Sequence, residues 1–319
     1  MENEIPEILH KNELFTIVIP VRNREKLILR SLDSAYRQTY RPLRIIVVDN
    51  GSTDGTAAAV ETWKAGHEDE DFHLDLLHEE RPGAAIARNR GLEAIDSRYM
   101  LFFDSDDVMA TESVTTAMHE FMKQPKLDLF FWRRAYINEK EEVIPMRFSK
   151  RDVSRAHCYN SVLSTQSYAV RTDFIRSCGA WNESLPCWDD WELGVRLLLA
   201  NPVMKGTYRI LAYVYPQKES ITGVDFSSKA GKWEKALDAV EALAEGKDKD
   251  VSHNIRRMIA YRRVNLAALY AAEGNRDLGE RLLARALNSS VLGKRDRGLL
   301  KIIYEYTRRG GRAAYLVWR

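Results

Sequence analysis

Apolar runs recur through the first third of the chain. They cover residues 14–21 (LFTIVIPV), 43–49 (LRIIVVD) and 98–104 (RYMLFFD). Short apolar runs of this kind, the first two rich in β-branched residues, are typical of strands covered on both faces. Residues 24–39 instead carry apolar side chains at helical intervals. The pattern predicts alternating strands and helices, and therefore an α/β fold with a mostly parallel sheet flanked by helices.

The pattern changes at about residue 225. From there the chain is rich in Ala, Leu, Arg and Glu, with apolar residues at helical spacing and Gly or Asn between the segments. This change predicts an α/β domain over residues 1–224 and an all-helical region over residues 225–319. Residues 266–287 resemble one tetratricopeptide-type hairpin, but a single unit does not establish a repeat array. A plain helical bundle or extension is the favoured interpretation.

Composition adds limits on function. Of the 319 residues, 45% are hydrophobic and 29% are charged, as in ordinary globular proteins. The 48 basic and 46 acidic side chains leave a formal net charge of +2, which argues against a nucleic-acid partner. Three cysteines in a chain of this length indicate reduced thiols. The chain also shows no signal-peptide pattern and no apolar run of about 18 residues, so we expect a cytoplasmic protein.

Acidic side chains gather where the apolar runs end. Asp49 closes the second run and Asp104 the third, and ligands of parallel sheets bind at such carboxyl ends of strands. Asp104, Asp106 and Asp107 lie within four positions of one another. The Asp-x-Asp spacing supplies oxygen ligands of the kind that Mg²⁺ and Mn²⁺ prefer. The alternative is a solvated acidic turn, or a helix cap formed by Asp106 or Asp107.

Two loops offer further binding chemistry. Residues 47–56 (VVDNGSTDGT) form a turn of small residues, in which Asp49 would accept hydrogen bonds from a base or a ribose. The alternative is that the Ser and Asp residues of this turn cap the next helix. Residues 81–91 (RPGAAIARNRG) lead into a helix with Arg88 near its start, which favours an anionic ligand.

A second acidic pair, Asp189 and Asp190, lies between Trp188 and Trp191. A carboxylate among aromatic rings is partly desolvated, which raises its pKa and suits a general base, while the indoles offer flat faces to a sugar. The alternative places both tryptophans in the core and has the acidic pair cap the helix that follows. The patterns GxGxxG, GxxxxGK[ST] and GxSxG are absent from the sequence, which argues against dehydrogenases, P-loop NTPases and α/β-hydrolases.

Five motifs stand in a telling order: TIVIPVRN, QTYRPLRIIVVDNGSTDGT, RPGAAIARNRGL, YMLFFDSDD and GAWNESLPCWDDWELGVRL. In order and spacing, residues 14–215 resemble the family-2 inverting glycosyltransferases with the GT-A fold. The resemblance implies a Rossmann-like GT-A domain that transfers a sugar from a nucleotide-diphosphate sugar, with UDP as the expected nucleotide. It also implies Mn²⁺ or Mg²⁺ on the diphosphate, and a glycan or lipid-linked saccharide as acceptor.

The resemblance implies a role for each matching position. The residues that match the family's donor site are Pro20, Asn23, Asp49, Arg88, Asp104, Ser105 and Asp106. Pro20 and Asn23 match the strand-end loop beside the nucleotide, and Asp49 matches the carboxylate that contacts the nucleobase. In the family's DxD pair, Asp104 matches the residue near the ribose and Asp106 the residue that holds the metal ion. Asp190 matches the usual catalytic base.

Some positions depart from the family's pattern. Arg22 replaces a frequent Tyr, Asn50 replaces a frequent second Asp, Asp189 stands where Glu is commoner, and residues 81–83 (RPG) stand where NxG is usual. Two other functions remain as alternatives: a sugar-nucleotide-binding protein without transfer activity, and a nucleotidyltransferase.

The end of the chain suggests a further contact. Residues 308–319 (RRGGRAAYLVWR) join four arginines to Tyr and Trp, a composition that favours peripheral contact with an anionic membrane on its inner face. The alternative is a helix packed on the catalytic domain with its basic residues in solvent.

Overall fold

The computed structural model describes residues 13–217 and 225–311 of the chain, which divides into two compact units. The first unit comprises Met1–Lys150, Leu163–Glu183 and Leu197–Pro216, and the second Arg151–Val162, Ser184–Arg196 and Gln217–Arg319. This division groups two earlier segments, 151–162 and 184–196, with the C-terminal helices. The domain boundary after residue 224 stays a prediction.

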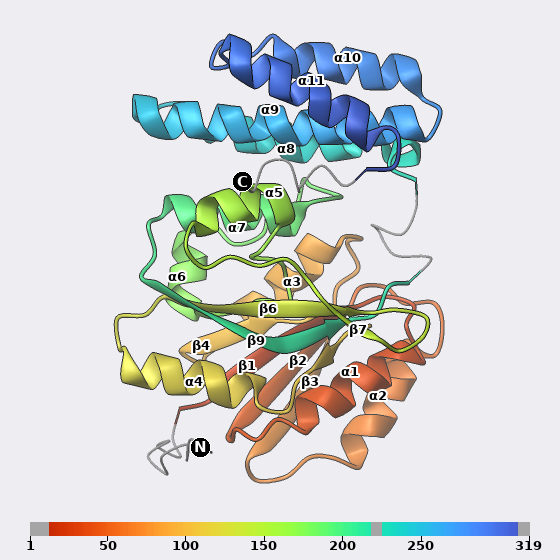
Figure 1. Cartoon of the computed structure of the whole chain (residues 1–319). Helices are drawn as coiled ribbons and strands as arrows, with labels where there is room; N and C mark the ends of the chain where they lie inside the picture. Colours follow the sequence, from red (N-terminus) through yellow and green to blue (C-terminus); the bar gives the residue numbers. More distant parts are fainter. Residues whose placement is uncertain (1–12, 218–224, 312–319) are drawn as a thin grey trace. The chain divides into compact units, whose positions relative to one another are not determined.

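The first unit is an α/β structure (Figure 1). Its strands are β1 (Phe15–Val21), β2 (Leu43–Asp49), β3 (Phe72–His78), β4 (Tyr99–Phe102), β5 (Val108–Met109), β6 (Leu129–Ile137), β7 (Val143–Pro145), β8 (Tyr168–Arg171) and β9 (Met204–Val214). Its helices are α1 (Leu27–Tyr36), α2 (Thr56–Ala65), α3 (Ala84–Glu93), α4 (Ser113–Lys123) and α6 (Thr172–Ser177). In the described residues the nine strands form one sheet in the order β3-β2-β1-β4-β8-β6-β9-β5, with β7 beside β6.

The pairing is parallel in the N-terminal half of the sheet and mixed in the rest. Strands β3, β2, β1 and β4 are parallel, so that Ile17 lies opposite both Ile45 and Leu101. Strand β8 pairs antiparallel with β4 and β6, whereas β9 pairs parallel with β6. The predicted sheet of alternating strands and helices is therefore confirmed, and its four parallel strands bring the carboxyl ends of β1, β2 and β4 to one edge.

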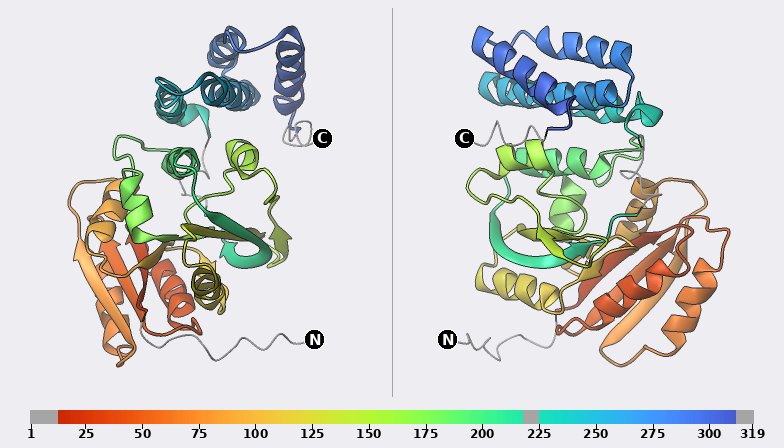
Figure 2. Two further views of the ribbon diagram at one scale, coloured as in Figure 1. Left: turned by 90° about the vertical axis from the view of Figure 1, so that its left-hand side faces the viewer. Right: turned by 45° about the vertical axis from the view of Figure 1, so that its right-hand side comes forward.

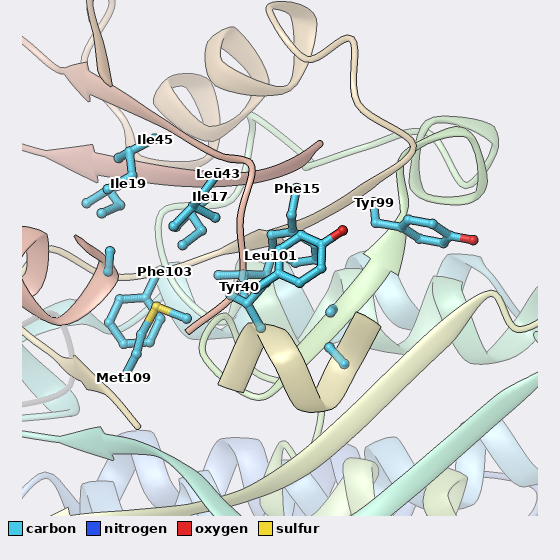
Figure 3. Close-up of a cluster of buried hydrophobic side chains, with 14 of the residues drawn as sticks. Phe15, Ile17, Ile19, Tyr40, Leu43, Ile45, Tyr99, Leu101, Phe103 and Met109 are labelled. Carbon is cyan, nitrogen blue, oxygen red and sulfur yellow. The ribbon is translucent and has the colours of Figure 1, made fainter. Parts of the chain in front are cut away.

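Helices cover both faces of these parallel strands. Ile17 and Ile19 of β1 belong to one buried cluster with residues of α1, α2 and α4, and Figure 3 shows them beside Leu43 and Ile45 of β2. The alternate residue Val18 faces α3 instead, where a Cβ added at Gly91 would lie 2.4 Å from Val18 Cγ1. A helix can approach the sheet this closely only where it has no side chain, which explains the glycine.

The second unit is helical in its described residues. It contains α5 (Val153–Asn160), the part of α7 (Asp189–Leu199) up to Arg196, the short 3-10 helix η1 (Ser227–Lys229), α8 (Lys232–Ala242), α9 (Lys249–Ala272), α10 (Arg276–Leu287) and α11 (Lys294–Thr307). Helices α8, α10 and α11, drawn with α9 in teal to dark blue in Figure 2, each pack against α9. At the contact of α9 and α10, a Cβ added at Gly279 would lie 2.6 Å from the Ala267 carbonyl oxygen.

The helical character predicted for the C-terminal region is confirmed. Within the described ranges, no helix is both long and apolar enough to cross a lipid bilayer. Of the basic segment 308–319, residues 312–319 lie outside the described residues.

Candidate active site

The loop after β1 is tied to the loop after β2. Pro20, near the end of β1, lies opposite Val48 of β2. Asn23 follows with a positive φ of 51°, a conformation that Asn tolerates better than most residues. Its backbone N–H donates to Ser52 Oγ (2.9 Å), and its Oδ1 accepts from the Thr53 N–H (2.8 Å). Asn23 thus fixes the shape of both loops at the edge where Asp49 lies.

Asp49 is the last residue of β2 and is only 5% exposed. Its Oδ1 accepts a hydrogen bond from the Ser52 N–H at 3.3 Å, and its Oδ2 lies 3.5 Å from His78 Nδ1 at the end of β3. The carboxylate is therefore held by the turn that follows it. The alternative in which Ser52 or Asp54 caps the next helix is wrong, because Gly55 is the N-cap residue of α2 and no side chain caps this helix; Asp54 Oδ1 accepts instead from the N–H of Thr56, the first helical residue, at 3.0 Å.

Asn50, the residue that departs from the family's pattern, is buried and organises the next loop. Its Nδ2 donates to the carbonyl oxygens of Glu79 (3.0 Å) and Arg81 (2.7 Å). Its Oδ1 accepts from the Gly83 N–H at 2.8 Å. A carboxylate offers no donor, so Asp at this position would not make the first two bonds. The amide therefore fits the RPG loop of this particular chain.

Arg88 binds Asp104 directly. It lies on α3 and is 6% exposed, and its Nη2 donates to Asp104 Oδ1 at 2.9 Å. The guanidinium also lies over the Trp181 ring, 4.4 Å from the ring centroid. A buried arginine needs such partners. Arg88 therefore holds one oxygen of the first carboxylate in the DxD pair.

Gln166 is a site residue that the sequence did not reveal. This side chain is 7% exposed, and its Nε2 donates to Asp104 Oδ2 and Asp107 Oδ2, both at 2.5 Å. Asp107 Oδ1 accepts a third bond, from the Tyr215 N–H at 3.1 Å. Two of the three carboxylates are thus fixed by donors from distant parts of the first unit. No spacing or motif marks Gln166 for this role.

The alternative in which Asp106 or Asp107 caps a helix is wrong. The residues after this loop form the short strand β5, and α4 begins only at Ser113, with Glu112 as its N-cap residue. Ser105, between the two acids of the DxD pair, is 8% exposed. The acidic loop is thus held inside the first unit rather than placed at a helix start.

Asp106 differs from its two neighbours. Within the part of the chain that the structure describes, no other residue's side chain hydrogen-bonds its carboxylate, although Arg30 Nη2 donates to its backbone carbonyl at 2.5 Å. Burial raises the pKa of Asp106 to about 6, and the charge of Asp104 adds to this effect. Burial and the charges of Asp104 and Asp106 also raise the pKa of Asp107 well above its usual range.

Crowded carboxylates with raised pKa values fit a divalent ion, because a cation offsets their repulsion. The described residues contain no group of three or more His, Cys, Asp or Glu side chains that would hold a metal by themselves. Mg²⁺ is usually held by one or two carboxylates together with substrate phosphates, so Asp106 with Asp104 beside it meets that requirement. The residues therefore fit an ion completed by a diphosphate.

In the second unit, Asp190 lies in the first turn of α7. Its Oδ1 accepts from the Trp191 N–H at 2.7 Å, and the Glu192 N–H donates to the Trp188 carbonyl at 3.0 Å. Both acids of the pair thus lie within the first turn of α7 itself. Trp191 is fully buried, so its face is not available to a sugar, and for this residue the core alternative is right.

In the second unit, Trp188 and Trp191 both contact an arginine that was not predicted from the sequence. The guanidinium of Arg262, on α9, lies 4.3 Å from the ring centroids of both Trp188 and Trp191. A signal was present, because Arg262 continues the buried helical stripe of Ile255, Ile259 and Leu266. An arginine on an apolar stripe indicates a buried partner.

The predicted site residues thus fall into two sets. The donor-site positions all belong to the first unit: Pro20, Asn23, Asp49, Arg88, Asp104, Ser105 and Asp106. They lie in β1, β2 and α3 or in the loops after β1 and β4. Asp190 belongs to the second unit.

Comparison with known proteins gives a family match. Residues 16–180 match the family model described as Glycosyl transferase family 2. The chain is 30% identical over 217 residues to the Escherichia coli UDP-Glc:alpha-D-GlcNAc-diphosphoundecaprenol beta-1,3-glucosyltransferase WfaP. That alignment covers 67% of this chain and 82% of WfaP.

Solved structures extend the likeness to the fold. Residues 1–349 of S. aureus TarS, in complex with UDP-GlcNAc, match with a TM-score of 0.67 and 18% identity over 92% of this chain and 87% of that one. The mannosyltransferase PcManGT from Pyrobaculum calidifontis, in complex with GDP-Man and Mn²⁺, matches with a TM-score of 0.62 and 19% identity over 95% and 84%. The predicted GT-A fold is confirmed.

Proposed function

Because the chain belongs to glycosyl transferase family 2, we propose that it is an inverting glycosyltransferase that uses a nucleotide-diphosphate sugar. The acceptor is a hydroxyl of a glycan or a lipid-linked saccharide. The observation that carries the proposal is the arrangement of the DxD loop. There Arg88 and Gln166 hold Asp104 while Asp106 keeps a carboxylate that no other described side chain binds.

A UDP-linked donor is supported by two relatives, since WfaP is named for UDP-Glc and TarS was solved with UDP-GlcNAc. PcManGT, solved with GDP-Man, makes GDP the competitor to test. Asp49 accepts hydrogen bonds from the base, Asn23 and Pro20 shape the loop against the nucleotide, and Asp104 faces the ribose. A lipid-linked acceptor is supported by the diphosphoundecaprenol substrate in the name of WfaP.

Asp106 holds the divalent ion, Mn²⁺ or Mg²⁺, with Asp104 beside it. When bound, such an ion offsets the negative charge that builds on the departing diphosphate. Asp190 accepts the proton of the acceptor hydroxyl, and the acceptor oxygen forms a bond to the anomeric carbon. The bond from that carbon to the diphosphate oxygen breaks, and its electron pair leaves with the nucleoside diphosphate. Attack from the opposite face converts an α-linked donor into a β-linked product.

Nucleotide binding tests the donor half of this proposal. We expect UDP to raise the melting temperature of the chain more in the presence of Mn²⁺ than in its absence, because binding to the folded state stabilises it. Asp106→Ala should lose the Mn²⁺-dependent part of the shift, and Asp49→Ala should bind UDP more weakly with little loss of fold stability. Equal UDP shifts with and without Mn²⁺ would remove the metal role of Asp106.

Transfer from UDP-glucose and UDP-N-acetylglucosamine to lipid-linked and free saccharides tests the base. Asp190→Asn should lower turnover by about 10²- to 10⁴-fold while UDP binding is kept. Asp277→Asn is the matched control, because Asp277 lies exposed in the first turn of another helix, α10. Near-normal turnover of Asp190→Asn would rule out this residue as the base. The anomeric coupling of the product, read by NMR, reports inversion.

The same assays separate the alternatives. A silent binding protein would show the Mn²⁺-dependent UDP shift but neither transfer nor UDP release. A nucleotidyltransferase would form a nucleotide sugar from a nucleoside triphosphate and a sugar phosphate, and would release pyrophosphate.

Peripheral contact with the inner face of the membrane is part of the proposal. The outer side of α11 exposes Leu299, Ile302 and Tyr306, at helical spacing, immediately before the basic segment 308–319. Apolar residues beside basic ones favour an anionic bilayer surface. Flotation with phosphatidylglycerol liposomes should recover the full chain better than a chain that ends at residue 311. Equal recovery would refute a role for the last eight residues.

A further inference from the structure

Arg262 of α9 is bound from several sides within the second unit. It is 8% exposed, and its Nη1 donates to the Cys158 carbonyl at 3.0 Å while its Nη2 donates to Ser161 Oγ at 3.0 Å. The remaining faces of the guanidinium meet the rings of Trp188 and Trp191. Cation–π contacts of this kind are stronger when they are desolvated. One side chain therefore joins α9, the end of α5 and the first turn of α7.

The start of α7 is a strained segment. Trp188 has a positive φ of 55°, which a bulky residue rarely adopts. Such strain persists only when the surroundings fix it. Trp188 is fixed by Trp233 of α8, with ring centroids 5.1 Å apart, and by Arg262. Three residues later, Trp191 is held by Arg262 and, through its carbonyl, by the buried His157 Nε2 at 2.9 Å. These contacts fix the turn on both sides of Asp190.

Arg262 differs in its partners from two other arginines of the second unit. Arg263 is paired with Asp238 and Glu241, and Arg196 is paired with Glu192. Burial lowers the pKa of Arg262 to about 10, and the charge of Asp190 acts in the opposite direction. This interaction is reciprocal, so Arg262 favours the ionised form of Asp190. Besides Asp190, the titratable groups whose charges act on Arg262 are Cys158 of α5 and Tyr261 of α9.

We propose that Arg262 is a positioning residue for Asp190: by contacting the rings of Trp188 and Trp191, its guanidinium holds the turn on both sides of Asp190 and places a positive charge that acts on this carboxylate. The inference rests on the proposed function, in which Asp190 accepts the proton of the acceptor hydroxyl. The C-terminal helices then contribute to the reaction through α9. Neither the sequence motifs nor the family match, which ends at residue 180, assigns Arg262 a role.

The test is the pH dependence of UDP release from UDP-glucose, with water as acceptor, in three variants. Arg262→Met removes the charge but keeps a flexible apolar side chain between the rings. We expect its kcat to fall at least tenfold and the acidic limb of its kcat profile to move up by about one pH unit, because loss of a cation disfavours the carboxylate. The KM for UDP-glucose should change less than twofold. Arg262→Lys should keep the acidic limb but lose part of kcat.

Arg263→Met is the matched control, because Arg263 is a neighbouring buried arginine on the same helix whose partners are Asp238 and Glu241. It should lower stability and leave the acidic limb unchanged. An unchanged limb in Arg262→Met would overturn the proposal, as would an equal shift in Arg263→Met. If Arg262→Met does not fold, Arg262→Lys decides: a lower kcat at unchanged KM supports the proposal, and wild-type kcat overturns it.

The role of Asp190 as base and the positioning role of Arg262 can be refuted independently. If Asp190→Asn retains turnover, the base assignment fails whatever Arg262 does. If Asp190→Asn is inactive and both Arg262 variants have the wild-type profile, the base stands and the positioning role of Arg262 is refuted.

Discussion

Replacing Gly91 with alanine should push α3 away from the sheet and loosen the ion pair of Arg88 with Asp104. The added Cβ would lie 2.4 Å from Val18 Cγ1 and 3.2 Å from Val48 Cγ2. Carbon atoms pack at about 3.5–4.0 Å, so the helix or the strand must yield by about 1 Å. Arg88 precedes Gly91 by one helical turn, and it moves with the helix.

Two opposed contributions set the change in the free energy of unfolding. Gly to Ala inside a helix normally stabilises by about 1 kcal/mol, whereas overpacking a filled core costs about 1–3 kcal/mol. Gly91→Ala should therefore lower the free energy of unfolding by up to about 2 kcal/mol. Gly298→Ala on α11 meets nothing within 4 Å. It should show the propensity gain alone, about 1 kcal/mol.

Urea unfolding and calorimetric titration with UDP are the assays. We expect Gly91→Ala to bind UDP more weakly as well as to unfold more easily. Val18→Ala removes the methyl group that the new Cβ meets, so the double variant should be less destabilised than the sum of the two single changes. The reasoning is refuted if Gly91→Ala is more stable than the wild type by the full propensity gain and binds UDP unchanged.

Two further predictions concern buried amides of the first unit. Gln166→Leu removes the donor between Asp104 and Asp107 and should lower the free energy of unfolding by about 1–3 kcal/mol in urea, since both acceptors stay buried. The exposed control Gln124→Leu should change it by less than about 0.5 kcal/mol, and equal effects would contradict the role of Gln166. Asn50→Asp should lower the free energy of unfolding by about 1–3 kcal/mol and speed proteolysis in residues 79–83. We expect this effect although Asp is common at this position in the family. An unaltered cleavage rate would contradict the prediction.

The parallel half of the sheet was predictable because burial on both faces leaves a simple pattern. The run at residues 43–49 coincides with β2 (Leu43–Asp49), and the run at 14–21 differs from β1 (Phe15–Val21) by one residue. The other half leaves no such pattern. All three residues of β7 are exposed, and β9 mixes exposed, partly buried and buried side chains without regular alternation and has a shifted register against β6. Pairing there depends on neighbours that a local sequence pattern does not contain.

The residues of the candidate site also differ in whether the sequence predicts them. Asp49 and Asp104 were predictable because parallel strands bring their carboxyl ends, and the residues that directly follow them, to one edge. Gln166 lies 59 residues from Asp107, and Arg262 lies 104 residues from Cys158, and no local spacing connects them. Both are buried polar side chains whose partners are supplied only by tertiary packing. The candidate binding residues thus leave a signal at the strand ends, whereas for Gln166 and Arg262 the sequence does not identify the partners that they hold.

The three carboxylates of the acidic loop differ in how they are held, which gives a physical reason to choose among them as the residue that binds the ion. The resemblance to the family distinguished them only by their positions in the motif. Asp104 is held at both oxygens, by Arg88 and Gln166, and Asp107 is held by Gln166 and the Tyr215 N–H. The charges of Arg24 and Arg30 lower the pKa of Asp106, yet burial, with the charge of Asp104, still leaves it raised to about 6. The positive charge of the protein therefore does not fully offset the negative charge of the carboxylates in this loop. A divalent ion bound at Asp106 would offset the rest.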